Sequence, residues 1–114
     1  DLYSPIDITV PARGSAIIDT GVHVQLPKGT AGMIKSKSGL NVKHDITSEG
    51  VVDVGYVGSM VVKLYNNGDT DYHVQRGDKI SQLVIVQIVT PHLMAVDKLD
   101  DSERGENGFG STGR

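Results

Sequence analysis

Short runs rich in β-branched and other apolar residues alternate with turn residues along the first 90 positions of the chain. Glycine, proline or Asn-Gly separates the runs, as is typical of short strands joined by turns. No segment repeats apolar residues every 3.6 positions between capping residues, so no helix is expected. The predicted strands are IDITVPA (6–12), SAIIDTGVHVQL (15–26), AGMIKSK (31–37), GSMVVKLYN (58–66), DYHVQRG (71–77) and KISQLVIVQIV (79–89). The pattern predicts an all-β chain, and many short strands at regular spacing favour a sandwich, barrel or jelly roll.

The connection NNGD (66–69) carries the strongest hairpin signal in the chain. Asn67 and Gly68 both accept positive φ angles, which the tight primed turns of two-residue hairpins require. We therefore expect VVKLY (61–65) and TDYHV (70–74) to pair with each other as the two strands of a hairpin.

The strand pattern ends at Pro91, and the rest of the chain is polar and rich in glycine. Residues 91–103 are predicted to form an extended arm. The last stretch, RGENGFGSTGR (104–114), cannot hold itself on a core, because glycine loses the most backbone entropy on ordering. It still carries a cation, an aromatic ring and hydroxyls, which predicts a mobile lid that orders over a ligand. The 114 residues are thus expected to form one domain, with a β core (1–90), the arm and the lid.

Charge and composition narrow the function classes. The net charge is −3, which argues against a general nucleic-acid or membrane-surface binder, because both need a dominant basic face. The longest nearly apolar run, LVIVQIV (83–89), is too short to span a bilayer. The chain has no cysteine, which excludes disulfides and thiolate metal sites and fits a reducing compartment. We expect a cytoplasmic protein, or one in the host cytoplasm or nucleus if it is viral or phage-encoded.

Two polar stretches are candidates for chemistry. In IKSKSGLNVKH (34–44), Lys37, Ser38 and Gly39 follow a predicted strand, and glycine lets backbone N–H groups approach an anion. Residue types alone also allow an ordinary polar loop there. In RGDKISQLVI (76–85), Gln82 lies in an apolar strand and needs either a structural hydrogen bond or a ligand.

The segment EGVVDVGYVGS (49–59) places Asp53 in an apolar, glycine-flanked turn with Tyr56 three residues later. A carboxylate at such a position is either a plain turn residue or, if partly desolvated, a general base. Tyr56 would then supply a flat surface for a ring. The four histidines are far apart and show no metal-ligand spacing.

Taken in order, DLYSP, KSKSGL, GVVDVGYVGS, RGDKISQLVI and RGENGFGSTG resemble the five motifs of the homotrimeric dUTPase family. Each motif is weak alone, but their order along nearly the whole chain is specific. The resemblance implies a distorted jelly-roll, β-clip-like fold and a threefold trimer with a mobile C-terminal arm. It also implies hydrolysis of dUTP to dUMP and pyrophosphate with Mg²⁺, which limits uracil incorporation into DNA and supplies dUMP for dTMP synthesis.

The resemblance also assigns roles to individual residues. Asp53 matches the aspartate that activates the attacking water, and Asp1 matches the aspartate that reaches Mg²⁺ through water. Tyr56 matches the ring that lies against the deoxyribose, while the backbones of Gly50 and Val61 match groups that bind uracil. The phosphate contacts are Lys37, Ser38, Gly39 and Gln82, and the lid contacts are Arg104, Phe109, Gly110, Ser111 and Thr112.

Some features depart from the family pattern. Lys37 stands where an arginine is usual, so a bidentate fork on phosphate becomes a point charge. The strand that usually precedes the first motif is expected to be missing before Asp1. Two alternatives remain at this point. A dCTP deaminase-like relative would need a glutamate base in the central motif, and a dUTPase-like regulatory binding domain would not need an intact active site.

Overall fold

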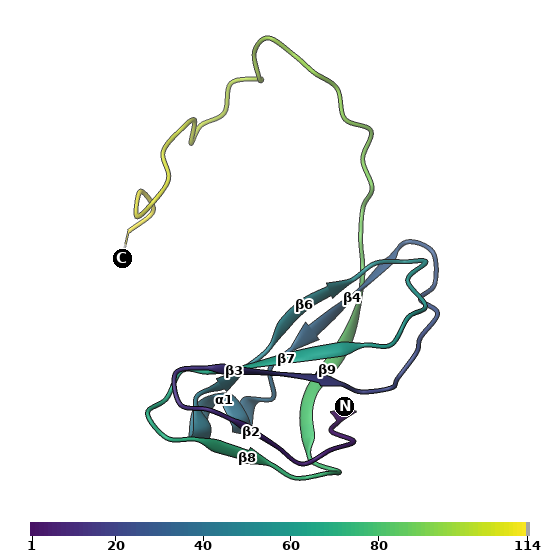
Figure 1. The fold of residues 1–114 in the computed structure, drawn as a ribbon. Coiled ribbons are helices and arrows are strands. Elements are labelled where there is room, and N and C mark those ends of the chain that lie inside the picture. Colours follow the sequence, from purple (N-terminus) through teal and green to yellow (C-terminus); the bar gives the residue numbers. More distant parts are fainter. Residues whose placement is uncertain (114) are drawn as a thin grey trace.

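Antiparallel strands in three small sheets form the body of the protein (Figure 1). The computed structural model describes residues 1–113, and Arg114, the last residue of the predicted lid, lies outside the described residues. One sheet has the order β1-β9-β4-β6, the second β2-β8 and the third β3-β7-β5. The elements are β1 (Leu2–Tyr3), β2 (Ile8–Val10), β3 (Ser15–Asp19), β4 (Thr30–Lys35), α1 (Ser38–His44), β5 (Ile46–Thr47), β6 (Glu49–Val52), β7 (Val61–Asn66), β8 (Tyr72–Val74) and β9 (Lys79–Gln87).

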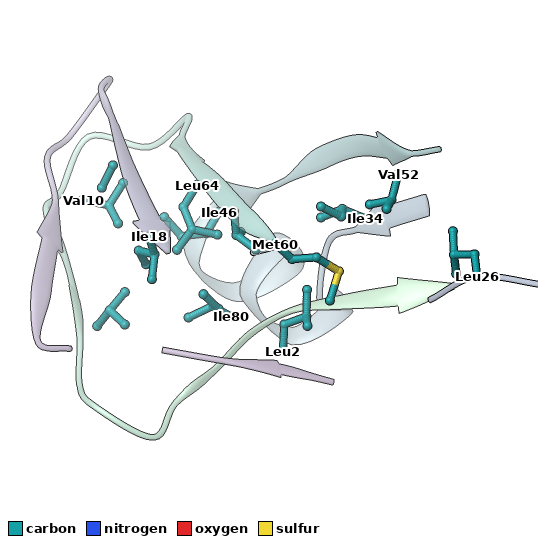
Figure 2. Packing of buried hydrophobic residues seen from close by; sticks show 13 residues of the cluster. Leu2, Val10, Ile18, Leu26, Ile34, Ile46, Val52, Met60, Leu64 and Ile80 are labelled. Carbon is teal, nitrogen blue, oxygen red and sulfur yellow. The ribbon is translucent and has the colours of Figure 1, made fainter. Parts of the chain in front are cut away.

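Alternating burial along the strands builds a single apolar core. In β7, Val62, Leu64 and Asn66 are buried while the residues between them face outward. This period of two is what a strand with one buried face requires. Figure 2 shows the core side chains of the different sheets gathered in one cluster, to which Met60, just before β7, belongs.

The predicted all-β class is confirmed, and every predicted strand overlaps an observed one, although β1, β5 and β6 lie outside the predicted strands. Two further details were wrong. Residues 38–44 form the short helix α1, which the sequence did not reveal because none of its residues is buried and no apolar stripe is needed. The strand predicted for 15–26 ends at Asp19, because Gly21 has φ of +69° and interrupts the ladder.

The predicted hairpin at NNGD is also wrong. β7 pairs with β3 and β5, whereas β8 pairs with β2 in a different sheet. The buried Asn66 side chain explains the connection, because its Nδ2 donates to Val10 O (3.0 Å) and Thr70 O (2.9 Å) and its Oδ1 accepts from Gly68 N–H (2.9 Å). These bonds replace those of a hairpin turn and direct the chain to the second sheet.

Replacing Asn66 with alanine is expected to lower the free energy of unfolding by about 1–3 kcal/mol, because buried carbonyl and N–H groups lose their partners. Urea unfolding at matched protein concentrations measures the change. Asn67→Ala is the matched control, since Asn67 is exposed and its side chain forms a long bond of 3.3 Å to Thr47 Oγ1. Equal stability of the two variants would contradict this role of Asn66.

The chain after β9 leaves the body as an extended arm, which Figure 1 shows in green to yellow. Residues 88–113 contain no helix or strand. The radius of gyration is 18.7 Å, compared with about 13 Å for a compact domain of this size. Over the same described part of the chain, no helix has the length and apolar character needed to cross a membrane.

Candidate active site

A pocket of about 370 Å³ lies between β6 and β7, and it brings together the four predicted site residues Gly50, Asp53, Tyr56 and Val61. The pocket exists because β6 and β7 belong to different sheets. β6 is an edge strand that pairs with β4, and β7 pairs with β3 along its length and with β5 only at its far end. The facing edges of β6 and β7 therefore present backbone groups that a flat ligand with donors and acceptors can bind.

The rest of the pocket wall is mostly apolar. It is formed by Ile17, Ile34, Val51, Val52 and Met60, with Glu49, Ser59 and Lys63 as polar members. Glu49 is held by Lys35, whose Nζ lies 3.0 Å from Glu49 Oε2. The wall thus suits the faces of a planar ring, while its polar groups are few and fixed, as in typical small-molecule sites.

Tyr56 is held over the turn by its own loop. Its hydroxyl donates to Ser59 O at 2.7 Å, and its ring is about half exposed. A Cβ on Gly58 would lie 2.5 Å from the Tyr56 hydroxyl oxygen, so only glycine permits this ring position. Sequence reasoning missed Gly58, although a glycine two residues after the tyrosine is the signal that marks it.

Asp53 is exposed in the single chain. Its backbone carbonyl accepts from Tyr56 N–H at 3.2 Å, which closes the turn, and its side chain forms no hydrogen bond or ion pair with any other described residue. The carboxylate is therefore open to a water or a ligand. The partial desolvation that a general base would gain is not supplied by this chain alone.

A second group of predicted residues gathers where β4 meets α1. Lys37 is the residue before the helix, and Ser38 and Gly39 begin its first turn, where backbone N–H groups have no helical acceptor. Lys37 Nζ lies 2.6 Å from Asp1 Oδ1, and Lys79 Nζ lies 3.5 Å from Asp1 Oδ2. The first and second motifs are thus neighbours, and they form a corner rich in cations.

The sequence left open whether Gln82 forms a structural hydrogen bond or binds a ligand, and the structure shows a structural hydrogen bond. Gln82 Nε2 donates to Ser36 O at 2.9 Å, next to Lys37.

Buried serines that sequence reasoning did not single out fix the same region. Ser48 Oγ and Ser81 Oγ lie 2.8 Å apart, and Ser81 Oγ donates to Lys35 O at 2.8 Å. These bonds tie the ends of β4 and β9 together and hold the corner in place.

Asp1 is the predicted metal residue, and its carboxylate is engaged by two lysines. No group of three or more His, Cys, Asp or Glu side chains gathers anywhere in residues 1–113. Among the described residues, the carboxylate of Asp1 is therefore not part of a cluster of three or more such ligands. Such a donor set fits Mg²⁺ that keeps most of its waters and takes its other ligands from a phosphate, and it does not fit an all-protein cage.

The predicted lid residues form a third group that is separate from the other two. Phe109 is fully exposed, and Arg104 Nε donates to Asn107 O within the tail itself. Figure 1 shows the tail far from β6 and β7. No hydrogen bond or ion pair in the described chain joins residues 104–113 to the pocket or to the corner.

A sequence model of the dUTPase family matches residues 1–113. The chain belongs to this family. Curated relatives called deoxyuridine 5'-triphosphate nucleotidohydrolase include those of Arabidopsis thaliana (48% identical, 99% of this chain and 69% of the relative) and Paramecium bursaria Chlorella virus 1 (44% identical, 99% and 81%). The predicted family membership is therefore confirmed.

Solved structures support the fold. The dUTPase of Staphylococcus bacteriophage 80alpha with dUPNHPP superposes with a TM-score of 0.93 at 30% identity, over 100% of this chain and 85% of that one. A variant dUTPase from phage phi11 of S. aureus, described with a structural Mg(II) ion, gives a TM-score of 0.82 at 27% identity, over 89% and 84%. The dUTPase-like β fold predicted from the motifs is thus confirmed.

Proposed function

We propose that this protein hydrolyses dUTP to dUMP and pyrophosphate. The observation that carries the proposal is the pocket between β6 and β7, in which Asp53 and Tyr56 lie beside the free strand edges at Gly50 and Val61. Membership of the dUTPase family and curated relatives named deoxyuridine 5'-triphosphate nucleotidohydrolase support it.

In this proposal, the pocket binds the base and the sugar and selects uracil and deoxyribose. The backbone groups of Gly50 and Val61 bind the imide edge of uracil, because adjacent donors and acceptors on a strand edge match those of the base. The Tyr56 ring lies against the deoxyribose and leaves no room for a 2′-hydroxyl. Its tether to Ser59 O makes that surface rigid, which is what steric exclusion requires.

The cationic corner binds the phosphates. Lys37, the first turn of α1 at Ser38 and Gly39, and Gln82 supply positive charge and donors. Lys37 must exchange its bond to Asp1 for one to a phosphate oxygen. Because that bond is between partly exposed side chains, the exchange costs little.

Asp53 acts as the general base. It takes a proton from water as the water oxygen attacks the α-phosphorus, and the bond from that phosphorus to the bridging oxygen of the β-phosphate breaks. Pyrophosphate leaves and dUMP remains. The exposed carboxylate with no partner in the described chain is free to accept the proton.

Mg²⁺ is the proposed cofactor. Asp1 would hold it through water, in keeping with the absence of a cluster of three or more ligating side chains among the described residues. When bound, Mg²⁺ neutralises charge on the triphosphate and favours departure of pyrophosphate. A variant dUTPase among the solved relatives is described with a structural Mg(II) ion, so this metal does bind to a member of the family.

A homotrimer with shared active sites is the proposed assembly. Met33, Val51 and Val84 lie directly opposite one another across β4, β6 and β9, so they share one face, and Val51 and Val84 are exposed. A continuous exposed apolar face is typical of a surface that another subunit covers. The arm likewise exposes Val89, Leu93, Met94, Val96 and Leu99, and in the proposal it carries the lid to a neighbouring subunit.

Lack of cysteine supports a cytoplasmic location, or a host compartment for a viral or phage protein.

A nucleotide panel tests the proposal. With Mg²⁺, dUTP is expected to be hydrolysed at least about 100-fold more efficiently than dTTP, dCTP or UTP. A rigid pocket rejects the added methyl group of dTTP and the added hydroxyl group of UTP, and the donors and acceptors that match the imide edge of uracil do not match cytosine. Pyrophosphate release measures the turnover. Ammonia release from dCTP would indicate a deaminase instead, and tight binding of dUTP without turnover would indicate a regulatory binding domain. Either result contradicts the proposal.

A further inference from the structure

Residues 19–23, here called the anchor segment, run beside residues 53–60, the tyrosine loop that carries Asp53 and Tyr56. The regular β3–β7 ladder ends at the pair Asp19 and Val61. Beyond it, Met60 O accepts from Thr20 N–H (3.0 Å) and from the buried Thr20 hydroxyl (2.6 Å), and Met60 N–H donates to Val22 O (2.9 Å). The base of the tyrosine loop is therefore bonded to the anchor segment on both sides of Gly21.

Gly21 forms a local bulge between these bonds. Its φ of +69° favours glycine, and its N–H donates to Asp19 Oδ1 at 3.0 Å. A bulge turns the strand and aims its side chains in new directions. Here it leaves Asp19 and His23, on its two sides, both bonded to the tyrosine loop.

Side chains of the anchor segment reach the tyrosine loop at two further points. The Ser59 hydroxyl donates to Asp19 Oδ1, and His23 Nδ1 bonds to Val57 O at 2.8 Å. The hydrogen bonds from Ser59 and Gly21 N–H lower the pKa of the Asp19 carboxyl, so it is an anion at neutral pH and a strong acceptor. Val57 and Ser59 enclose Gly58, the residue over which the Tyr56 ring lies.

We infer that the anchor segment is a specificity-determining element, with Asp19 and His23 acting as positioning residues for the Tyr56 ring. The inference rests on the proposed function, in which this ring excludes the 2′-hydroxyl. The Tyr56 hydroxyl bonds to Ser59 O, and the Ser59 side chain bonds to Asp19, so Ser59 links the ring to the anchor segment. Asp19 and His23, which do not line the pocket, thus hold Val57 and Ser59 and position the ring indirectly.

The test uses the full-length chain with Asp19→Ala, His23→Ala and the double variant. Both residues are exposed, so the variants should fold. Asp19→Asn and His23→Gln are the conservative variants, because each keeps a group that can form the same bond. Asp69→Ala is the matched control, since Asp69 is an exposed aspartate that accepts from Arg13 Nε at 2.9 Å, away from the tyrosine loop.

Two readouts are needed. The first is the ratio of kcat/KM for dUTP to that for UTP. We expect this ratio to fall about tenfold in the double variant, because the steric barrier loosens but does not vanish. In the control Asp69→Ala, the ratio is expected to stay unchanged. The second is the ¹⁹F spectrum of 3-fluorotyrosine-labelled protein without nucleotide, with the Tyr56 signal assigned from Tyr56→Phe. The chemical shift of that signal is expected to change in the double variant and in the positive control Gly58→Ala. In the conservative variants Asp19→Asn and His23→Gln, it is expected to keep its wild-type value.

Each result decides one question. A double variant with wild-type selectivity, or with an unchanged Tyr56 signal, overturns the positioning role. If the wild-type chain itself fails to hydrolyse dUTP, the proposed function fails, whereas the ¹⁹F shift still shows whether the anchor segment positions the ring. A lower selectivity, a shifted Tyr56 signal and recovery in the conservative variants together support the inference.

Discussion

Asp53→Asn is expected to lower the turnover of dUTP by about 100- to 10,000-fold and to leave nucleotide affinity within a few-fold of wild type. Asparagine keeps the shape and the backbone turn but cannot accept a proton, and a general base contributes about 10²–10⁴ in rate. Because the Asp53 side chain bonds to no described residue of its own chain, the change should not disturb the pocket wall. Single-turnover pyrophosphate release measures the chemistry, and calorimetry with a non-hydrolysable imido analogue of dUTP measures binding.

Asp71→Asn provides the control for this experiment. Asp71 is an exposed aspartate whose Oδ1 accepts from Ala12 N–H at 2.8 Å, outside the pocket. The control is expected to turn over dUTP at the wild-type rate. If Asp53→Asn also keeps near-wild-type turnover, Asp53 is not the base, and the assignment of its role is wrong.

The strands could be predicted because their signal is local. In β7 and β3, the runs VVKLYN and SAIID are rich in β-branched and other apolar residues, although Val61 and Ile17 are exposed and Asn66 is buried. The helix α1 could not be predicted, because none of its seven residues is fully buried and only Leu40 packs against the core, so the segment carries no apolar period. The strands that pair with each other also could not be predicted from the sequence. NNGD has the composition of a hairpin turn, yet the buried Asn66 side chain bonds to Val10, 56 residues away, and sends the chain to another sheet.

The candidate site shows the same division between local and long-range information. Motif order supplied the candidate residues, since each motif is a short stretch with its own composition. Their grouping depends on strand pairing that no short stretch encodes. Gly50, Tyr56 and Val61 meet only because β6 and β7 join different sheets. The anchor segment gave no motif signal at all, because its contacts with the tyrosine loop come from residues about 40 positions away in the chain.

The separation of the lid from the pocket leads to the prediction about assembly. In one chain, Asp53 lies at the β6–β7 pocket, while Arg104 and Phe109 lie on a tail that Figure 1 shows extending away from the body. The family resemblance puts motifs one, two and four of an active site on one subunit, motif three on a second and the tail on a third. Closed threefold symmetry then gives every tail an equivalent neighbour to cover. Each active site in this arrangement needs three chains.

Co-refolding two inactive variants tests this arrangement. Asp53→Asn and a chain that ends at Glu103 are each expected to be nearly inactive alone. In an equal mixture, a site works when its Asp53 comes from the truncated chain and its tail from the Asp53→Asn chain, so random threefold mixing predicts about one quarter of wild-type activity. Mixing the truncated chain with a chain that carries both changes is the control and should restore nothing. If trimers verified as mixed by mass spectrometry show no recovery, Asp53 and the tail act within one subunit, and the extended arm must fold back onto its own pocket.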